Sequence, residues 1–434
     1  MKYIIIMESK TVKKNYTLPI VIMFALFFMI AFVTGYQNPL GNVIKELTGG
    51  SSLMSQLGNL ANFIAYAVMG IPAGKLLQKY GYRVTALAAV SVGFAGVLIT
   101  WFSGMGNNVV LYLAGAFVAG FSMCMLNTVV NPMLNSLGST PNKGNQLVQF
   151  GGTFNSLGAT LAPIVVGYLI GGQAQNIASA DPVFYLAMGI FAVAFAVLYF
   201  SKLPEDPDLG KPQEKIKVMG AFKYSNFTLG VIAIFFYVGI EVGIANISFQ
   251  YISESGIVKA NNTTDASIIA GAAVGMYWLL MLVGRLIGGA VGGKVSSRAM
   301  LTFVSALGLV LVLAGILSSE NVIVPMLGIE KEGGLSFSMI NLPINVIFFI
   351  LCGLCTSVMW GAIFNLSVTG LGKFTAVASG VFMCLVCGGG ILPAIQGAIA
   401  DATSIISSYW LVFAMIGYLL FYALVGSKSK ALKQ

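Results

Sequence analysis

A series of long apolar runs constrains this chain more than any other feature of its sequence. A helix that crosses a bilayer needs about 20 mainly apolar residues. Charged residues make up only 9% of the chain, against 57% hydrophobic residues, and so little charge cannot cover a water-exposed surface. Composition therefore predicts an all-α membrane protein and excludes a soluble enzyme, a nucleic-acid-binding protein and a disordered chain. Hydropathy places about twelve membrane-spanning runs, at 16–37, 53–77, 84–104, 108–132, 146–171, 181–201, 225–252, 266–289, 300–318, 341–369, 376–400 and 406–426.

The basic residues predict which side of the membrane the loops face. Lysine and arginine collect in cytoplasmic loops, and an even number of crossings puts both termini on one side. If both termini are cytoplasmic, all but four of the 23 lysines and arginines fall in cytoplasmic segments. The four are Lys45, Lys259 and Lys331 outside and Arg285 within an apolar run. The net charge of +9 is thus a topology signal, and no nucleic-acid partner is expected.

The N-terminal residues do not predict a cleavable signal peptide. Residues 1–6 are apolar but far too short to span, and a polar stretch through Asn15 follows. Met7 could equally be the true start. The first spanning helix would then act as an uncleaved insertion signal.

The residues that usually carry catalysis or bind metal are scarce. Histidine is absent, which removes the commonest general base and metal ligand, and no G-x-x-x-x-G-K loop for ATP is present. The pairs Cys352–Cys355 and Cys384–Cys387 have a spacing found in zinc sites. Both pairs lie in apolar runs, so we expect small buried hydrophobic side chains instead. We therefore expect neither a metal site, an organic cofactor nor an enzymatic activity.

A polar segment divides the chain into two parts. Residues 202–224 are rich in proline, glycine and mixed charge, which is typical of a linker, and six apolar runs lie on each side. Both parts contain a glycine-rich helix end that leads into a short basic loop, at 70–83 and at 288–298. The sequence predicts an N-terminal six-helix half at 1–201, a cytoplasmic linker at 202–224 and a C-terminal six-helix half at 225–434, with a binding site between the pseudo-symmetric halves.

Several segments form recognisable motifs. The loop after the second run reads Gly70-Ile-Pro-Ala-Gly74-Lys75-Leu-Leu-Gln-Lys79-Tyr-Gly81-Tyr-Arg83. Four more motifs lie within apolar runs and are Asn127-Thr-Val-Val-Asn131-Pro132, Thr153-Phe-Asn155-Ser-Leu-Gly158-Ala, Tyr237-Val-Gly-Ile-Glu241-Val and Ser357-Val-Met-Trp360-Gly-Ala-Ile-Phe364. Together with the two six-helix halves they resemble the major facilitator superfamily, in particular the branch of the L-fucose/proton symporter and the bacterial glucose/galactose transporters. The resemblance runs over nearly all twelve runs, with Leu77 at the usual acidic position of the loop.

This resemblance implies a transporter of the bacterial inner membrane that works by alternating access. The expected substrate is a neutral monosaccharide, a hexose or a 6-deoxyhexose such as fucose, glucose or galactose, imported together with H⁺ or Na⁺. We expect a monomer in the lipid bilayer. Two alternatives stay open, namely an uncoupled sugar facilitator and an exporter of small amphipathic compounds, which would prefer a more apolar cavity.

One acidic residue lies deep inside an apolar run. Glu241 has this position, whereas the other acidic residues lie in loops or near the ends of runs. Ionisable groups in the membrane are costly and usually mark ion or substrate pathways. Glu241 is therefore the first candidate for cation coupling, against the alternative of a structural carboxyl group that is hydrogen-bonded between helices.

Amide side chains predict a polar cavity. Asn127, Asn131 and Asn135 recur at i, i+4 and i+8 on one helix face, and Asn38 lies at the end of the first run. Carboxamides both donate and accept hydrogen bonds, which suits sugar hydroxyls, although such groups also join helices to one another. Further amides that could line the cavity are Asn59, Asn62, Gln149, Asn155, Asn246, Gln250, Asn365 and Gln396.

The resemblance also bears on ion coupling. In the fucose symporter an aspartate in the first span and a glutamate in the fourth serve substrate binding and proton coupling, and the matching residues here are Asn38 and Asn127, which cannot titrate. Three residues before Asn155, the family's common glutamine is Gly152 in this chain. The family's proton route cannot be carried over. Proton movement through Glu241, sodium coupling at Glu241 and uncoupled diffusion stay open, with cation coupling favoured.

Aromatic and basic residues complete the predicted site. Sugars stack their apolar faces on aromatic rings, and Tyr237 and Trp360 lie deep within matched motifs. Arg285 lies near the inner end of its run, where we expect it to snorkel or to pair with loop groups. We expect it to form a cytoplasmic gate together with Lys75 and Arg83.

Overall fold

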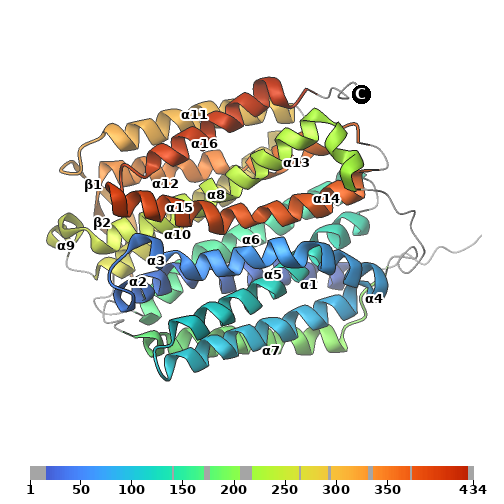
Figure 1. The fold of residues 1–434 in the computed structure, drawn as a ribbon, viewed down its shortest axis with the longest axis horizontal. Helices are drawn as coiled ribbons and strands as arrows, with labels where there is room; N and C mark the ends of the chain where they lie inside the picture. The colour runs from blue at the N-terminus through green and yellow to red at the C-terminus, as the bar shows by residue number, and fades with distance from the viewer. Residues whose placement is uncertain are drawn as a thin grey trace, which may run out of the picture.

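Long helices that run side by side make up most of the structure (Figure 1). The computed structural model describes residues 16–138, 141–170, 176–205, 218–262, 265–291, 295–330, 336–371 and 374–428. In lipid every backbone polar group needs an internal partner, and a helix supplies it within one segment. The helices are α1 (Thr17–Thr34), α2 (Gln37–Leu47), α3 (Ser52–Ser55), α4 (Leu57–Gly104), α5 (Val109–Leu137), α6 (Pro141–Ile170), α7 (Asp181–Phe200), α8 (Ser225–Glu254), α9 (Gly256–Asn261), α10 (Ala266–Val291), α11 (Ser297–Leu317), α12 (Ile344–Thr356), α13 (Met359–Val368), α14 (Thr375–Cys384), α15 (Gly388–Ala402) and α16 (Tyr409–Phe421), with short 3-10 turns at Ile177–Ala180, Val218–Lys223 and Leu385–Cys387 and a π-helical turn at Tyr422–Gly426.

Helix α4 reconciles the observed helices with the predicted number of crossings. Eleven helical segments within the described residues are long and apolar enough to span a membrane, and α4 alone has 48 residues. Gly81 interrupts α4 with φ of 82° and ψ of 178°, a conformation that favours glycine. The predicted runs at 53–77 and 84–104 are therefore two crossings joined at this kink. Twelve crossings and the predicted helical membrane fold are confirmed.

The helices form two groups that lie side by side (Figure 1). Helices α1 to α7 occupy the lower part of this view and α8 to α16 the upper part. One end of the molecule, here called the hairpin end, carries α2, α3, α9 and the strands β1 (Ile323–Glu330) and β2 (Ser336–Pro343). The opposite end, here called the kink end, carries the α4 kink.

Glycines bring the two helix groups into close contact along α6 and α10. A Cβ atom on Gly271 of α10 would lie 2.5 Å from the Pro163 carbonyl oxygen of α6. A Cβ on Gly275 would lie 2.7 Å from the Ile164 side chain. Small residues let membrane helices approach until their backbones nearly touch. A displacement of α10 is therefore transmitted directly to α6.

Strands β1 and β2 were not predicted. They pair in antiparallel register from Ile323–Pro343 to Glu330–Ser336, where the sequence suggested only a loop between two spans. The hairpin connects α11 to α12 at one end of the bundle and leaves the helical architecture unchanged. It is the only sheet within the described residues.

The expected linker is described only in part. Residues 206–217 lie outside the described part of the chain, whereas 218–223 form a 3-10 turn ahead of α8. On the other side, Glu205 accepts hydrogen bonds from the backbone N–H groups of Tyr82 at 2.7 Å and Arg83 at 3.0 Å. The start of the segment is thus held against the α4 kink.

Candidate functional site

Two predicted asparagines lie one turn apart on α5. Asn127 and Asn131 are both half-buried. The Nδ2 atom of Asn127 donates to the Tyr66 hydroxyl of α4 at 3.2 Å and to the Met123 carbonyl at 3.1 Å, and Nδ2 of Asn131 donates to the Asn127 carbonyl at 2.9 Å. Among the described residues no group donates to either carboxamide oxygen. Both oxygens are available to accept a hydrogen bond from a ligand hydroxyl.

Asn155 connects α6 to α1. Its Nδ2 atom donates to the Phe27 carbonyl at 3.0 Å, and the adjacent Phe154 ring stacks on Phe24 with centroids 4.9 Å apart. The side chain is half-buried. The amide nitrogen of Asn155 therefore holds α6 against α1.

An ion pair lies where α8, α10 and α6 meet. Nη2 of Arg285 is 3.6 Å from Oε1 of Glu241, and each side chain is 14% exposed. Nη1 of the same arginine donates to the Gly152 carbonyl of α6 at 2.6 Å. We expected Arg285 to snorkel or to pair with loop groups. It instead contacts two spanning helices, because a half-buried guanidinium group needs anionic and carbonyl partners within reach.

Hydroxyl groups surround the Glu241 carboxylate and backbone. The Tyr277 hydroxyl of α10 donates to the Glu241 carbonyl at 3.2 Å and lies 3.2 Å from Thr356 Oγ1 of α12. The buried Tyr237 hydroxyl interacts electrostatically with both Glu241 and Arg285, although it meets hydrogen-bond geometry with no described residue. A polar side chain that is buried without a partner is costly. The Tyr237 hydroxyl therefore belongs to the same polar cluster as Glu241 and Arg285.

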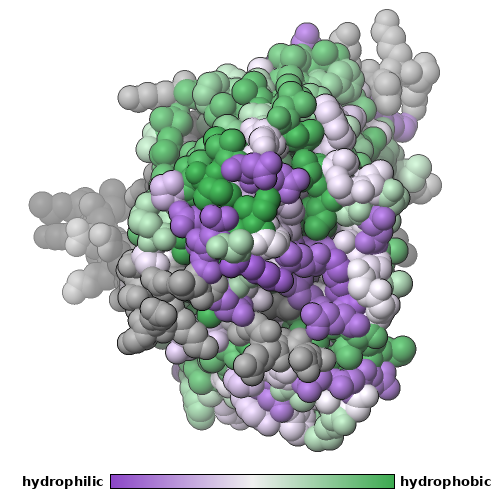
Figure 2. All heavy atoms as spheres, turned by 90° about the vertical axis from the view of Figure 1, so that its left-hand side faces the viewer, coloured by the Kyte–Doolittle hydropathy of each residue, from purple (hydrophilic) through white to green (hydrophobic). Residues whose placement is uncertain are grey.

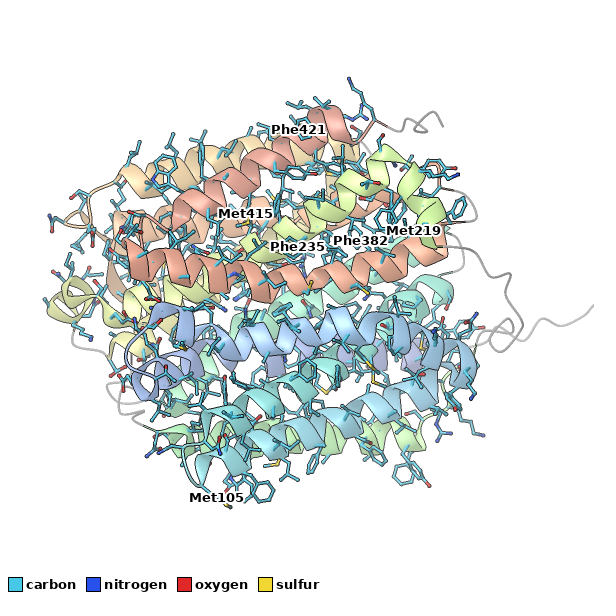
Figure 3. The ribbon with its side chains drawn as sticks, in the orientation of Figure 1. Met105, Met219, Phe235, Phe382, Met415 and Phe421 are labelled. Atoms are coloured by element: carbon cyan, nitrogen blue, oxygen red, sulfur yellow. The ribbon has the colours of Figure 1, made fainter. Side chains whose placement is uncertain are left out.

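The predicted aromatic pair forms next to this cluster. The Tyr237 ring meets Trp360 of α13 at 6.1 Å between centroids with an interplanar angle of 61°. Trp360 in turn meets Phe382 of α14 at 5.7 Å and 83°. Figure 3 places Phe382 and Phe235 inside the upper helix group, toward the lower one. The ring edges and faces provide an apolar wall beside the charged pair.

Not all predicted site residues join this cluster. Asn365 on α13 has an exposed side chain. The side chains of Asn38 on α2 and Gln149 on α6 lie outside the described part of the structure. Five of the other amides make hydrogen bonds between helices or to neighbouring turns, namely Asn59 to the Gly389 carbonyl, Asn62 to the Ala116 carbonyl, Asn246 to Gln56, Gln250 to Ser52 and Gln396 to Ser408.

The expected cytoplasmic gate does not form as a unit. Lys75 is exposed on α4. Arg83 donates from Nε to the Leu198 carbonyl at 3.3 Å and from Nη2 to the Tyr199 carbonyl, and its guanidinium lies over the Tyr199 ring. These contacts join α4 to α7 within one helix group. Arg83 and Arg285 therefore hold different interfaces, because the kink at Gly81 turns Arg83 toward α7.

A polar seam that the sequence did not reveal joins the two groups at the hairpin end. Figure 2 looks onto this end and shows hydrophilic residues gathered across its centre, with apolar surface above and below. The Asp401 carboxylate of α15 accepts from Ser51 Oγ at 2.6 Å and from the backbone N–H groups of Ser52 and Leu53 at 2.6 and 2.9 Å. We call these four residues the Asp401 clasp. It holds α15 against the start of α3.

Further bonds run along the same seam. Lys45 and Glu254 form an ion pair at 2.8 Å, and Asn42 donates to Ser253 at 2.7 Å. The sequence predicted that Lys45 lies outside the membrane and that acidic residues such as Glu254 and Asp401 lie in loops or near the ends of runs, but it could not pair them. The helix groups are thus joined at the hairpin end. The Glu241–Arg285 ion pair, whose arginine also donates to the Gly152 carbonyl, lies further toward the kink end.

The five cysteines of the chain are free thiols. Four are buried and Cys384 is half-buried. Within the described residues no group of three or more Cys, Asp or Glu side chains is arranged to hold a metal ion.

Comparison with known proteins gives consistent matches along most of the chain. The family model described as Major Facilitator Superfamily matches residues 22–394. A glucose/galactose transporter of Brucella abortus is 28% identical over 427 residues, covering 96% of each protein. An L-fucose-proton symporter of Haemophilus influenzae is 22% identical, covering 91% of this chain and 92% of the relative.

Solved structures show the same fold. The crystal structure of FucP, a transporter in the outward conformation, superposes with a TM-score of 0.66 at 19% identity and covers 94% of this chain and 98% of its own. The structure of a D-xylose-proton symporter superposes with a TM-score of 0.64 at 14% identity, covering 96% and 98%. At these identities the likeness concerns the arrangement of helices.

Proposed function

The chain belongs to the Major Facilitator Superfamily, and from this premise we propose that it imports a neutral monosaccharide, a hexose or a 6-deoxyhexose, across the bacterial inner membrane. It is a multi-pass membrane transporter and not an enzyme. The relatives named as glucose/galactose transporters and fucose-proton symporters cover nearly the whole chain and support this substrate class. The observation that carries the proposal is the pair of half-buried asparagines on α5 whose carboxamide oxygens accept no bond from described residues.

We also propose that the two halves of the chain rock against each other during transport. Residues 1–201 and 225–434 move against each other, and the hairpin end faces outward, with both termini and the kink end in the cytoplasm. The excess of lysine and arginine in the loops of the kink end supports this orientation. The seam at the hairpin end supports a state that is closed to the outside. The transporter acts as a monomer, because each chain contains both halves.

Glu241 is the proposed coupling group, and the coupling ion is a proton. The carboxylate already has Arg285 beside it at 3.6 Å, and a bound sodium ion next to a guanidinium group would be repelled. A proton removes the charge on Glu241 without occupying space. Sodium coupling and uncoupled diffusion are the outcomes against which this is tested.

Uptake by the purified protein in proteoliposomes tests the function. We expect labelled glucose, galactose or fucose to accumulate when an inward proton gradient is imposed and to equilibrate only when a sodium gradient replaces it. Accumulation driven by sodium would contradict proton coupling. Equilibration under both gradients would identify a facilitator. Extrusion of amphipathic dyes without any sugar flux would overturn the proposal in favour of an exporter.

Replacing Asn131 with alanine is expected to raise the KM for sugar by about tenfold. The variant loses a hydrogen bond with a net contribution of about 1 kcal/mol, and the sugar hydroxyl is left without its acceptor. Asn127→Ala should have a similar effect. The matched control is Asn261→Ala on exposed α9, where the amide makes the same bond to the carbonyl one turn earlier, at 2.8 Å. An unchanged KM in both α5 variants, with normal expression, would count against a sugar site at this face.

A further inference from the structure

Arg285 contacts both helix groups at once. Its Nη1 atom donates to the Gly152 carbonyl of α6 at 2.6 Å, whereas its Nη2 atom faces the Glu241 carboxylate of α8 at 3.6 Å. Arg285 itself belongs to α10. The bond to Gly152 therefore joins the two groups, while the ion pair with Glu241 stays within one of them.

The two contacts are made by different nitrogens of one guanidinium group, and their partners lie on different helices. The short bond to Gly152 is already formed, whereas the 3.6 Å separation from Glu241 is longer than a hydrogen bond. A charged Glu241 attracts the guanidinium toward α8, and the attraction is strong because both side chains are largely buried. When Glu241 becomes neutral this attraction disappears. The carbonyl of Gly152 is then the stronger of the two remaining partners.

The groups that face Glu241 are few. On its own helix it faces the hydroxyl of Tyr237, and from α10 it is faced by Arg285 and Tyr277. From α12, the hydroxyl of Thr356 contacts the Tyr277 hydroxyl at 3.2 Å and is linked to Glu241 only by way of that tyrosine. Among the described residues, Arg285 is the one cation that interacts with the carboxylate.

Because residue 152 is a glycine, no side chain covers its carbonyl, and Arg285 can reach it. A Cβ atom on Gly152 would lie 3.6 Å from Nη1 of Arg285, at van der Waals contact. A longer side chain would cover the carbonyl or compete for the guanidinium. Because α10 packs on α6 through glycines, a change in this bond acts directly on the interface between the groups.

We propose that Arg285 is a positioning residue that converts the neutralisation of Glu241 into a tighter hold of α10 on α6 at the Gly152 carbonyl, so that the kink end closes. Ionisation of Glu241 draws the guanidinium back and lets the kink end open. The proposal rests on the proposed function, in which Glu241 takes up the coupling proton. It adds the link between that proton and the movement of the two helix groups.

A distance measurement tests this link without any sugar. Spin labels replace Val197 of α7 and Phe303 of α11, two exposed positions near the kink end on opposite groups, in a full-length variant without native cysteines. We expect two distance populations whose ratio changes about tenfold between about pH 5 and about pH 8, the size of a typical coupling free energy. Glu241→Gln should hold the shorter distance at both pH values.

The double variant separates this role from a merely structural ion pair. In E241Q/R285Q we expect both distance populations to return and to be independent of pH, and sugar exchange, slowed about tenfold in E241Q, to recover. Arg298→Gln is the control, since Arg298 bonds Ser427 at 3.1 Å away from the site. Melting temperatures of all variants are measured in parallel.

Each outcome decides the matter. Populations in E241Q that match the unsubstituted protein, or an E241Q/R285Q variant as restricted as E241Q, would overturn the link. Recovery of exchange that merely follows recovery of the melting temperature, with no change in the distances, would also overturn it. A protein that shows the distance changes but carries no sugar would refute the proposed function and leave the link supported.

Discussion

Glu241→Gln carriers are expected to lose concentrative sugar uptake altogether. Glutamine keeps the shape of the side chain but cannot ionise, so it cannot exchange a proton during the transport cycle. A gradient of about two pH units supports an accumulation of up to about one hundredfold with one proton per sugar, since each unit is worth about 1.4 kcal/mol. The variant should only equalise the sugar concentrations on the two sides.

Accumulation is measured in proteoliposomes with an imposed proton gradient, together with exchange of labelled against unlabelled sugar. The matched control is Glu320→Gln, because Glu320 also faces a tyrosine hydroxyl, that of Tyr251 at 2.7 Å, but lies at the hairpin end. Glu320→Gln should accumulate sugar like the unsubstituted protein. Equal accumulation by Glu241→Gln would remove Glu241 from the coupling mechanism.

Removing one member of the ion pair also has a structural cost. Breaking a fully buried pair costs about 3–5 kcal/mol, but here the two groups are separated by 3.6 Å and retain some exposure. Arg285 also keeps its bond to the Gly152 carbonyl. The Glu241→Gln protein should therefore fold, and its expression and melting temperature show whether the loss of accumulation is a matter of coupling.

The helical framework could be predicted because the information is local. Each span is an apolar run whose length matches the bilayer, and the run at 84–104 is separated from its predecessor by Gly81, the residue that makes the kink. The hairpin was missed because the length of an apolar run identifies a spanning helix but not a pair of strands. Strand β1 is an almost continuous apolar run, whereas β2 alternates only in part, so the two strands share no regular two-residue period from which their pairing could be predicted.

The sequence singled out several residues that the structure brings together, but it did not give the contacts between them. Glu241 was identified because a lone carboxyl group within an apolar run is costly. Arg285 was expected to snorkel, because the sequence alone does not distinguish a long basic side chain that reaches water from one that reaches a neighbouring helix. The position of Gly152 opposite Arg285 depends on how α6 crosses α10, which is a property of the packed glycines.

The Asp401 clasp shows where sequence reasoning stops. Ser51 and Asp401 are 350 positions apart, and each looks like an ordinary loop residue at the end of a span. Only the approach of α15 to α3 makes them partners. A signal could have come from Asp401 as an acidic residue directly after an apolar run, but nothing in the sequence names its donors.

Replacing Asp401 with alanine is expected to open the hairpin end. The carboxylate accepts three hydrogen bonds, two of them from backbone N–H groups of α3 that have no other partner before the first helical turn. Hydrogen bonds to a charged group contribute about 1.5–3 kcal/mol each when shielded, and less where water reaches them. A loss of about 1.4 kcal/mol already changes the ratio of closed to open carriers tenfold.

The neighbouring ion pair should matter much less. Lys45 and Glu254 lie 2.8 Å apart, but Glu254 is 38% exposed, and exposed pairs contribute about 0–1 kcal/mol because water and salt screen them. Lys45→Ala should therefore change the closed-to-open ratio by less than about fivefold. Asp401 is itself exposed, so the larger effect expected of the clasp comes from its three hydrogen bonds, two of them from donors that are fixed in the backbone.

Thiol labelling measures this opening. A cysteine in place of the buried Ser55, which lies in the seam beside Gln250, should react with a membrane-impermeant maleimide about tenfold faster when Asp401 is alanine. Asp265→Asn is the matched control, because that carboxylate also caps a helix start, bonding the Ser267 N–H at 2.8 Å, but within one helix group. Unchanged labelling in the Asp401 variant would mean that the apolar contacts between α4 and α15 hold this end shut without the clasp. Faster labelling would show that outward opening begins with the release of Asp401 from α3, at the opposite end of the interface from the Arg285 bond to α6.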